Sequence, residues 1–156
     1  MIKTAVRMAL LSKIVYCDYD RINRILLKMG LKDWYWFDNE GTQAMMIKTD
    51  KELIVCFRGT EPTQVADLMA DIKVWRKPAR EKGLVHFGFA QALDKVYDKI
   101  IDQIDKLQTT GLKMICTGHS LGAALATIFA SRVDAKYLYT FGSPRVGNRD
   151  FVNEMN

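Results

Sequence analysis

Histidine is scarce in this chain of 156 residues, which has only two, His86 and His119. The cysteine count is odd, and the wide spacing of Cys17, Cys56 and Cys116 fits no metal-binding motif. Because Cys56 and Cys116 lie inside apolar runs typical of strands, we expect buried free thiols in a reducing compartment. The pattern therefore argues against a disulfide framework and against a metal site.

Long apolar runs and dense positive charge are also missing. The apolar run over residues 121–130 is too short to cross a bilayer. The net charge of +5 is modest, and no cluster of lysine or arginine is interleaved with aromatic residues, so we expect no nucleic-acid partner. The basic N-terminus hints at a signal peptide, but Ser12 and Lys13 interrupt the apolar stretch. A helix and a cytoplasmic location are favoured instead.

The apolar patterning predicts one α/β domain over residues 1–156, with no linker. Asp20 is the expected N-cap of the second helix, and Gly30 is expected to stop it. The predicted order of elements favours a mostly parallel central sheet flanked by helices. These elements are a helix with a buried face of Ile2, Ala5, Val6, Ala9, Leu10 and Ile14; a helix over 21–29; strands over 44–47 and 53–57; helices over 63–70 and 87–107; a strand over 112–117; a helix over 121–132; and a strand over 137–141.

The pentapeptide Gly118-His119-Ser120-Leu121-Gly122 lies between a predicted buried strand and a predicted helix of small residues. This strand-turn-helix setting is the one in which a serine nucleophile is presented. Glycines at both ends let the strand and the helix close around the turn, and the N–H of Leu121 would face a developing oxyanion. The sequence thus predicts Ser120 as a nucleophile, and the alternative is a tight turn without chemistry.

Several further motifs accompany this pentapeptide, in an order and spacing that extend from about residue 44 to the end of the chain. With them, the chain resembles the class 3 lipases, the fungal lipase-like branch of the α/β-hydrolases. The motifs are Val-Cys-Phe-Arg-Gly-Thr over residues 55–60, Ala70-Asp71, Val-His-Phe-Gly-Phe over residues 85–89, and Phe-Gly-Ser-Pro-Arg-Val-Gly-Asn over residues 141–148.

The resemblance implies an α/β-hydrolase fold and a hydrolase of lipid or small carboxylic esters, with contact to lipid surfaces and no metal or organic cofactor. It makes Thr60 the second oxyanion-hole residue and Asp71 the acid that holds Thr60 in place. It also places a lid at residues 61–69 and His86 near the active site without making it the catalytic base. Without the resemblance, Thr60 would be interpreted as a turn residue and Asp71 as a helix cap.

A catalytic base and acid are harder to find. No histidine follows Ser120, and the resemblance would place both partners beyond Asn156. We therefore expect an incomplete domain, truncated at its C-terminal side: a fragment, a truncated product or a split protein. His119 is expected to point away from Ser120 and pack beside the turn, whereas His86 either lines the substrate pocket or substitutes as the base.

Two acidic residues after Ser120 fit the role of catalytic acid poorly. We interpret Asp134 as a surface turn residue and Asp150 as the start of a helix. The strand over 137–141 is expected at an exposed sheet edge, where another chain could associate. The second hypothesis is therefore a non-catalytic module that binds acyl chains or a partner.

Overall fold

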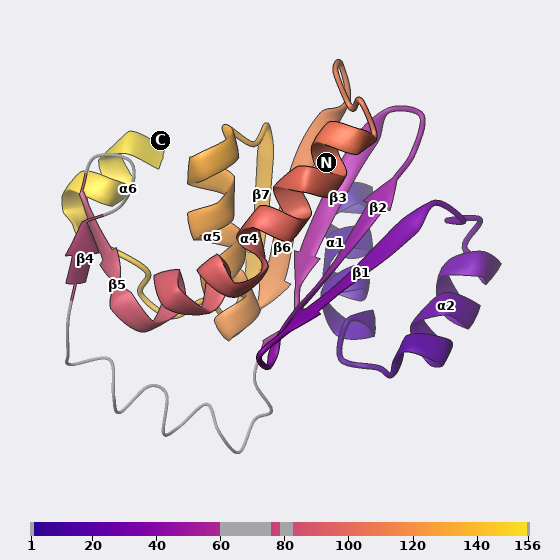
Figure 1. Ribbon diagram of the computed structural model, residues 1–156, viewed down its shortest axis with the longest axis horizontal. Coiled ribbons are helices and arrows are strands. Elements are labelled where there is room, and N and C mark those ends of the chain that lie inside the picture. The colour runs from indigo at the N-terminus through magenta and orange to yellow at the C-terminus, as the bar shows by residue number, and fades with distance from the viewer. Residues whose placement is uncertain (1, 60–75, 79–82, 156) are drawn as a thin grey trace.

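The computed structural model describes residues 2–59, 76–78 and 83–155, and its centre is a five-stranded sheet with helices on both faces (Figure 1). Across the sheet, the strands are β1 (Trp34–Asn39), β2 (Thr42–Lys48), β3 (Glu52–Phe57), β6 (Lys113–His119) and β7 (Tyr137–Phe141). The helices are α1 (Ile2–Ile14), α2 (Tyr19–Lys28), α4 (Phe87–Lys106), α5 (Leu121–Val133) and α6 (Arg149–Met155). A separate antiparallel pair joins β4 (Arg76–Pro78) to β5 (Leu84–His86).

The predicted α/β class is confirmed, but the sheet is mixed rather than mostly parallel. β1 pairs with β2, and β2 with β3, antiparallel. β3 pairs with β6, and β6 with β7, parallel. The physical reason is connection length: short turns join the first three strands, whereas parallel neighbours need a crossover. α4 and α5 provide the helices of the two crossovers.

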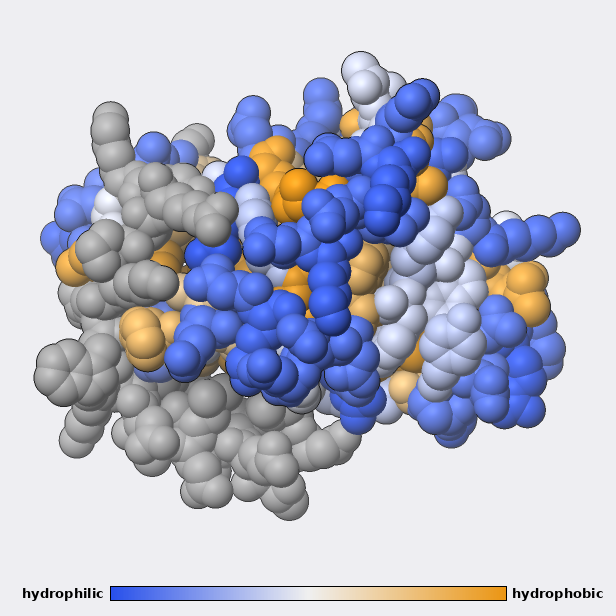
Figure 2. Space-filling view, in the orientation of Figure 1, coloured by the Kyte–Doolittle hydropathy of each residue, from blue (hydrophilic) through white to orange (hydrophobic). Residues whose placement is uncertain are grey.

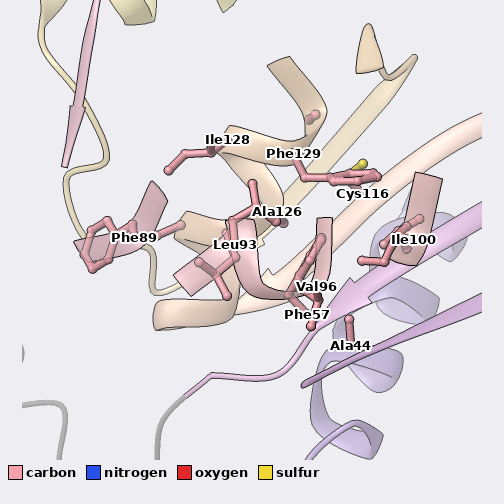
Figure 3. Packing of buried hydrophobic residues seen from close by; sticks show 14 of the residues in the cluster. Ala44, Phe57, Phe89, Leu93, Val96, Ile100, Cys116, Ala126, Ile128 and Phe129 are labelled. Atoms are coloured by element: carbon pink, nitrogen blue, oxygen red, sulfur yellow. The ribbon is translucent and has the colours of Figure 1, made fainter. Parts of the chain in front are cut away.

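Two apolar clusters cover the two faces of the sheet. α4 and α5 cover one face, and their side chains, Leu93, Val96 and Phe129 among them, point toward each other and toward the strands (Figure 3). The outer surface of the molecule on the side of α4 is mostly hydrophilic (Figure 2). α1 and α2 supply the second cluster on the other face. Figure 1 shows α4 in front of the strands and α1 behind them.

The two cysteines in the strands lie on opposite faces of the sheet. Cys116 belongs to the cluster with α4 and α5, and Cys56 belongs to the cluster with α1 and α2. Both are fully buried free thiols, as predicted, while the free Cys17 is half-buried. Burial raises the pKa of the Cys56 thiol to about 12 and that of Cys116 further.

The helix α1 is confirmed, but its predicted face is wrong at three of six residues: Ile14 is buried as predicted, and Ala5 and Ala9 are half-buried. Ile2, Val6 and Leu10 are exposed, with 83%, 63% and 45% of their surface accessible. Met8 and Leu11 face the sheet instead and are fully buried. Both sides of this helix are apolar, so periodicity could not tell which side would meet the sheet.

Smaller differences concern element ends. Asp18, not Asp20, caps α2, because its side chain accepts the N–H of Arg21 at 2.9 Å. Asp20 lies in the first turn. β1, β4 and β5 were not predicted, whereas the strand over 137–141 matches β7 residue for residue. The helix predicted over 63–70 lies outside the described residues. None of the described helices is both long and apolar enough to cross a membrane.

Candidate active site

Ser120 occupies the turn between β6 and α5 in a strained backbone conformation. Its φ of 56° and ψ of −125° lie in a region that residues with a side chain rarely adopt. The N–H of Ser120 donates to the carbonyl oxygen of Phe141 at 3.0 Å, which ties the turn to the end of β7. The residue is 6% exposed. Such strain persists only where the surrounding structure fixes it.

Two glycines make this turn possible because backbones approach each other at both. A Cβ at Gly118 would overlap the carbonyl of Gly122 and lie 2.7 Å from the nitrogen of Ala123. A Cβ at Gly122 would overlap the carbonyl oxygen of Phe57. The end of β3, the end of β6 and the start of α5 therefore meet at the elbow, and no larger residue fits at these two positions.

The N-terminus of α5 supplies backbone donors beside Ser120. The carbonyl oxygen of Ser120 accepts the N–H of Ala123 at 3.0 Å and that of Ala124 at 3.4 Å. Leu121 opens the helix, where N–H groups have no partner within the helix itself. The hydroxyl of Ser120 makes no capping hydrogen bond to α5 among the described residues. An oxyanion formed beside Ser120 would meet the N–H of Leu121 and the positive end of the helix dipole.

His119 lies beside the turn, on the side of the sheet that α1 covers. Its side chain is exposed, and its Nδ1 lies 3.2 Å from the hydroxyl oxygen of Tyr16. The two rings meet edge to face with their centroids 6.1 Å apart. The contact with Tyr16 had no signal in the sequence, because 103 positions separate the two residues.

His86 lies at the junction of β5 and α4, where it is the N-cap residue of the helix. Its ring packs on Phe89 with the centroids 4.3 Å apart. Both ring nitrogens are buried without a hydrogen-bond partner in the described part of the chain. Burial lowers the pKa of His86, because desolvation disfavours the charged imidazolium. Within that part, no hydrogen bond or ring contact joins His86 to the elbow.

The remaining predicted site residues divide into two groups. Thr60, Asp71 and the predicted lid lie outside the described residues. Asp134 is exposed and ends α5 in a left-handed conformation, with φ 49°, as expected of a surface turn residue. Asp150 lies in the first turn of α6, also as expected, and its carboxylate accepts the amide of Asn148 at 3.1 Å.

The segment that contains the elbow matches a known protein family. The family model "Lipase (class 3)" matches residues 54–156, a segment that begins inside β3 and includes the elbow and β7. The chain belongs to the class 3 lipase family. The family resemblance drawn from the motifs is thereby confirmed.

Two relatives of this class 3 lipase chain are secreted mono- and diacylglycerol lipases. The protein from Malassezia restricta is 34% identical over 160 residues, which cover 90% of the chain and 52% of the relative. The protein from Fusarium solani is 44% identical over 75 residues, which cover 44% of the chain and 22% of the relative. The chain thus spans about half or less of the length of these relatives.

Solved lipase structures share the fold. The crystal structure of the lipase from Rhizopus microsporus var. chinensis superposes with a TM-score of 0.78 at 23% identity, covering 99% of this chain and 61% of that one. At this identity the likeness bears on the fold alone. The expectation of an α/β-hydrolase-like architecture is confirmed by it.

Proposed function

We propose that this chain supplies the nucleophile of a serine carboxylic-ester hydrolase. The strained backbone of Ser120, held between Gly118 and Gly122 at the junction of β6 and α5, carries the proposal. Membership of the class 3 lipase family supports it. The N–H of Leu121 and, by the resemblance, Thr60 are the proposed oxyanion donors, with Asp71 holding Thr60.

The proposed reaction forms and then hydrolyses an acyl-enzyme. The hydroxyl oxygen of Ser120 attacks the ester carbonyl carbon as its proton passes to a base, and the carbonyl oxygen becomes an oxyanion that the N–H donors stabilise. When the C–O ester bond breaks, the alcohol leaves with that proton. Water then attacks the acyl carbon as it passes a proton to the same base. The bond from the acyl carbon to the Ser120 oxygen breaks, that oxygen takes the proton back, and the carboxylic acid leaves. No metal or organic cofactor takes part.

Glycerol esters of fatty acids are the proposed substrates, presented at a lipid surface. The support for this class is that two relatives are named mono- and diacylglycerol lipases. We propose a reducing, cytoplasmic compartment, because the buried thiols are free. The two relatives, in contrast, are named as secreted. β7, which ends the described sheet, is the proposed edge for association with another chain.

A fluorophosphonate probe tests the nucleophile directly, because it phosphonylates a serine only where a base activates the hydroxyl. Peptide mass spectrometry should find the label on Ser120, and Ser120→Ala should abolish it. Ser143→Ala, which removes an exposed serine hydroxyl that bonds locally to Pro144, is the matched control and should leave labelling unchanged. Absence of labelling in the unmodified chain would favour the non-catalytic module that binds acyl chains or a partner.

His86 is the alternative base, and its variant separates two roles. If His86 accepts the proton of Ser120, His86→Ala should abolish both labelling and turnover of p-nitrophenyl butyrate. If His86 only lines the pocket, turnover should persist. Unchanged turnover would exclude His86 as the base.

A further inference from the structure

Tyr16 follows α1 and is held at the carboxyl edge of the sheet by the anchors of that helix. Arg7 pairs with Glu52 at the start of β3, with 2.5 Å between the charged atoms. The hydroxyl of Ser12 lies 3.0 Å from that of Thr117 in β6, and Thr117 in turn donates to the carbonyl oxygen of Tyr139 at 2.9 Å. α1 is thus fixed to β3 and β6 before the chain reaches Tyr16.

The hydroxyl of Tyr16 contacts the elbow at two atoms of His119. It donates to the carbonyl oxygen of His119 at 3.4 Å and lies 3.2 Å from the Nδ1 of the same residue. A tyrosyl hydroxyl has one proton to donate. If that proton goes to the carbonyl oxygen, Nδ1 must be the donor in the second contact. If it goes to Nδ1 instead, that nitrogen is the acceptor at the shorter distance, so the hydroxyl of Tyr16 bonds His119 in either tautomer.

The same hydroxyl touches the end of the neighbouring strand. A Cβ at Gly59 would overlap the hydroxyl oxygen of Tyr16 and would lie 2.5 Å from the carbonyl oxygen of His119. The guanidinium carbon of Arg58 lies 5.6 Å from the ring centroid of Tyr16, within the range of a cation–π contact. Tyr16, Gly59 and His119 therefore converge on one point.

This point lies where the pairing of the two central strands stops. The last partners of β3 and β6 are Phe57 and Gly118. Beyond them, the N–H of Arg58 donates to Gln43, at the start of β2, and the N–H of Ser120 donates to Phe141, at the end of β7. The segments that follow β3 and β6 thus bond to their outer neighbours and not to each other at the level of the elbow. Tyr16 bridges the gap between these two segments, which we call the seam.

We propose that Tyr16 is a positioning residue, whose hydroxyl holds the elbow at His119 against the end of β3 at Gly59. By fixing the backbone of His119, it orients the N–H groups of Ser120 and Leu121 that follow. The catalytic consequence rests on the proposed function, whereas the structural coupling does not.

Tyr16→Phe tests the proposal because it keeps the ring and removes only the hydroxyl. Tyr137→Phe, at the opposite end of β7 on an exposed side chain, is the matched control. In long-range ¹H–¹⁵N spectra, the Nδ1 signal of His119 should be the same in the unmodified chain and in the control, and it should shift in Tyr16→Phe, which removes its hydrogen-bond partner. Amide hydrogen exchange should accelerate about tenfold at both Arg58 and Ser120, the two groups on either side of the seam.

Activity provides a separate readout. Fluorophosphonate labelling of Ser120 should slow about tenfold in Tyr16→Phe, less than the ~10²–10³-fold loss that follows removal of an oxyanion donor itself. For a soluble ester, kcat should fall while KM stays the same. If the unmodified chain is not labelled at all, the proposed function fails, and the exchange rates still decide the coupling. Unchanged exchange at either Arg58 or Ser120 would overturn the proposal, and so would an unchanged Nδ1 signal of His119.

Discussion

Gly122→Ala should destabilise the protein, although alanine normally favours a helix. Replacing glycine inside a helix gains up to about 1 kcal/mol. At Gly122, however, the new methyl group would overlap the carbonyl oxygen of Phe57 and lie 2.9 Å from the carbonyl carbon of Arg58. Both are backbone atoms of the central strand and cannot rotate away. Overpacking of this kind costs about 1–3 kcal/mol or more, so a net loss of about 2 kcal/mol is expected.

Gly88→Ala is the matched control, because Gly88 is likewise the second residue of a helix. Among the residues that the structure describes, a Cβ there would meet only the ring of His86, at 3.3 Å, and that side chain can move by a few tenths of an ångström. Its effect should lie between neutral and about 1 kcal/mol of stabilisation.

Urea unfolding, followed by tryptophan fluorescence, to which Trp34 and Trp36 in β1 contribute, measures both variants. With an m-value of about 2 kcal/mol/M, the midpoint should fall by about 1 M for Gly122→Ala. Gly88→Ala should leave the midpoint unchanged or raise it slightly. Equal midpoints for the two variants would refute the close approach of α5 to β3.

Three further predictions concern groups away from the elbow. Native protein at pH 8 should react with a thiol reagent at Cys17 and not at Cys56, whose pKa is about 12, while unfolded protein should react at all three cysteines. His86 should titrate below its usual value of about 6.5 in NMR spectra. The unfolded state then takes up the proton first, so stability should fall as pH drops below about 6.5, and His86→Gln should reduce this slope. Arg132→Ala should cost about 1–2 kcal/mol in urea unfolding, because the nearly buried side chain, 5% exposed, packs over the ring of Tyr97. Its pair with Asp94 at 2.7 Å adds less, since that carboxylate is 38% exposed; an unchanged midpoint would contradict the prediction.

The elbow could be predicted because its determinants are local. A strand, two glycines four positions apart and a run of small residues predict the turn from one short segment, although Phe57 and Phe141 help to hold it in the folded chain. The contacts of Gly118 and Gly122 bear out the steric reasoning. The same locality explains the match of β7 and the correct pairing of β2 with β3 across a short turn.

Features that depend on distant partners could not be predicted in this way. The predicted face of α1 was wrong at Val6 because Val6 and Met8 are equally plausible core residues until the sheet is in place. Tyr16 carries no motif of its own, and its role depends on segments about 40 and 100 positions further along the chain.

β1, by contrast, has a local signal in the sequence: an aromatic run before a Glu-Gly pair. Its aromatic run precedes a hairpin turn in which both Glu40 and Gly41 have positive φ, 47° and 81°. Positive φ at both central positions is the geometry of the tight turns that join antiparallel strands. The aromatic residues before this Glu-Gly pair therefore indicated a strand.

The pairing of β3 with β6 also has a consequence for how the chain folds. β1, β2 and β3 form a meander of near neighbours, whereas β6 reaches β3 only after the intervening chain, α4 included, has closed a long loop. Such non-local pairing costs loop entropy and is slow. We therefore expect the meander to form early and the pairing of β3 with β6 to form late. Since the elbow at Ser120 directly follows β6, a reagent that reacts with Ser120 reports the completion of folding.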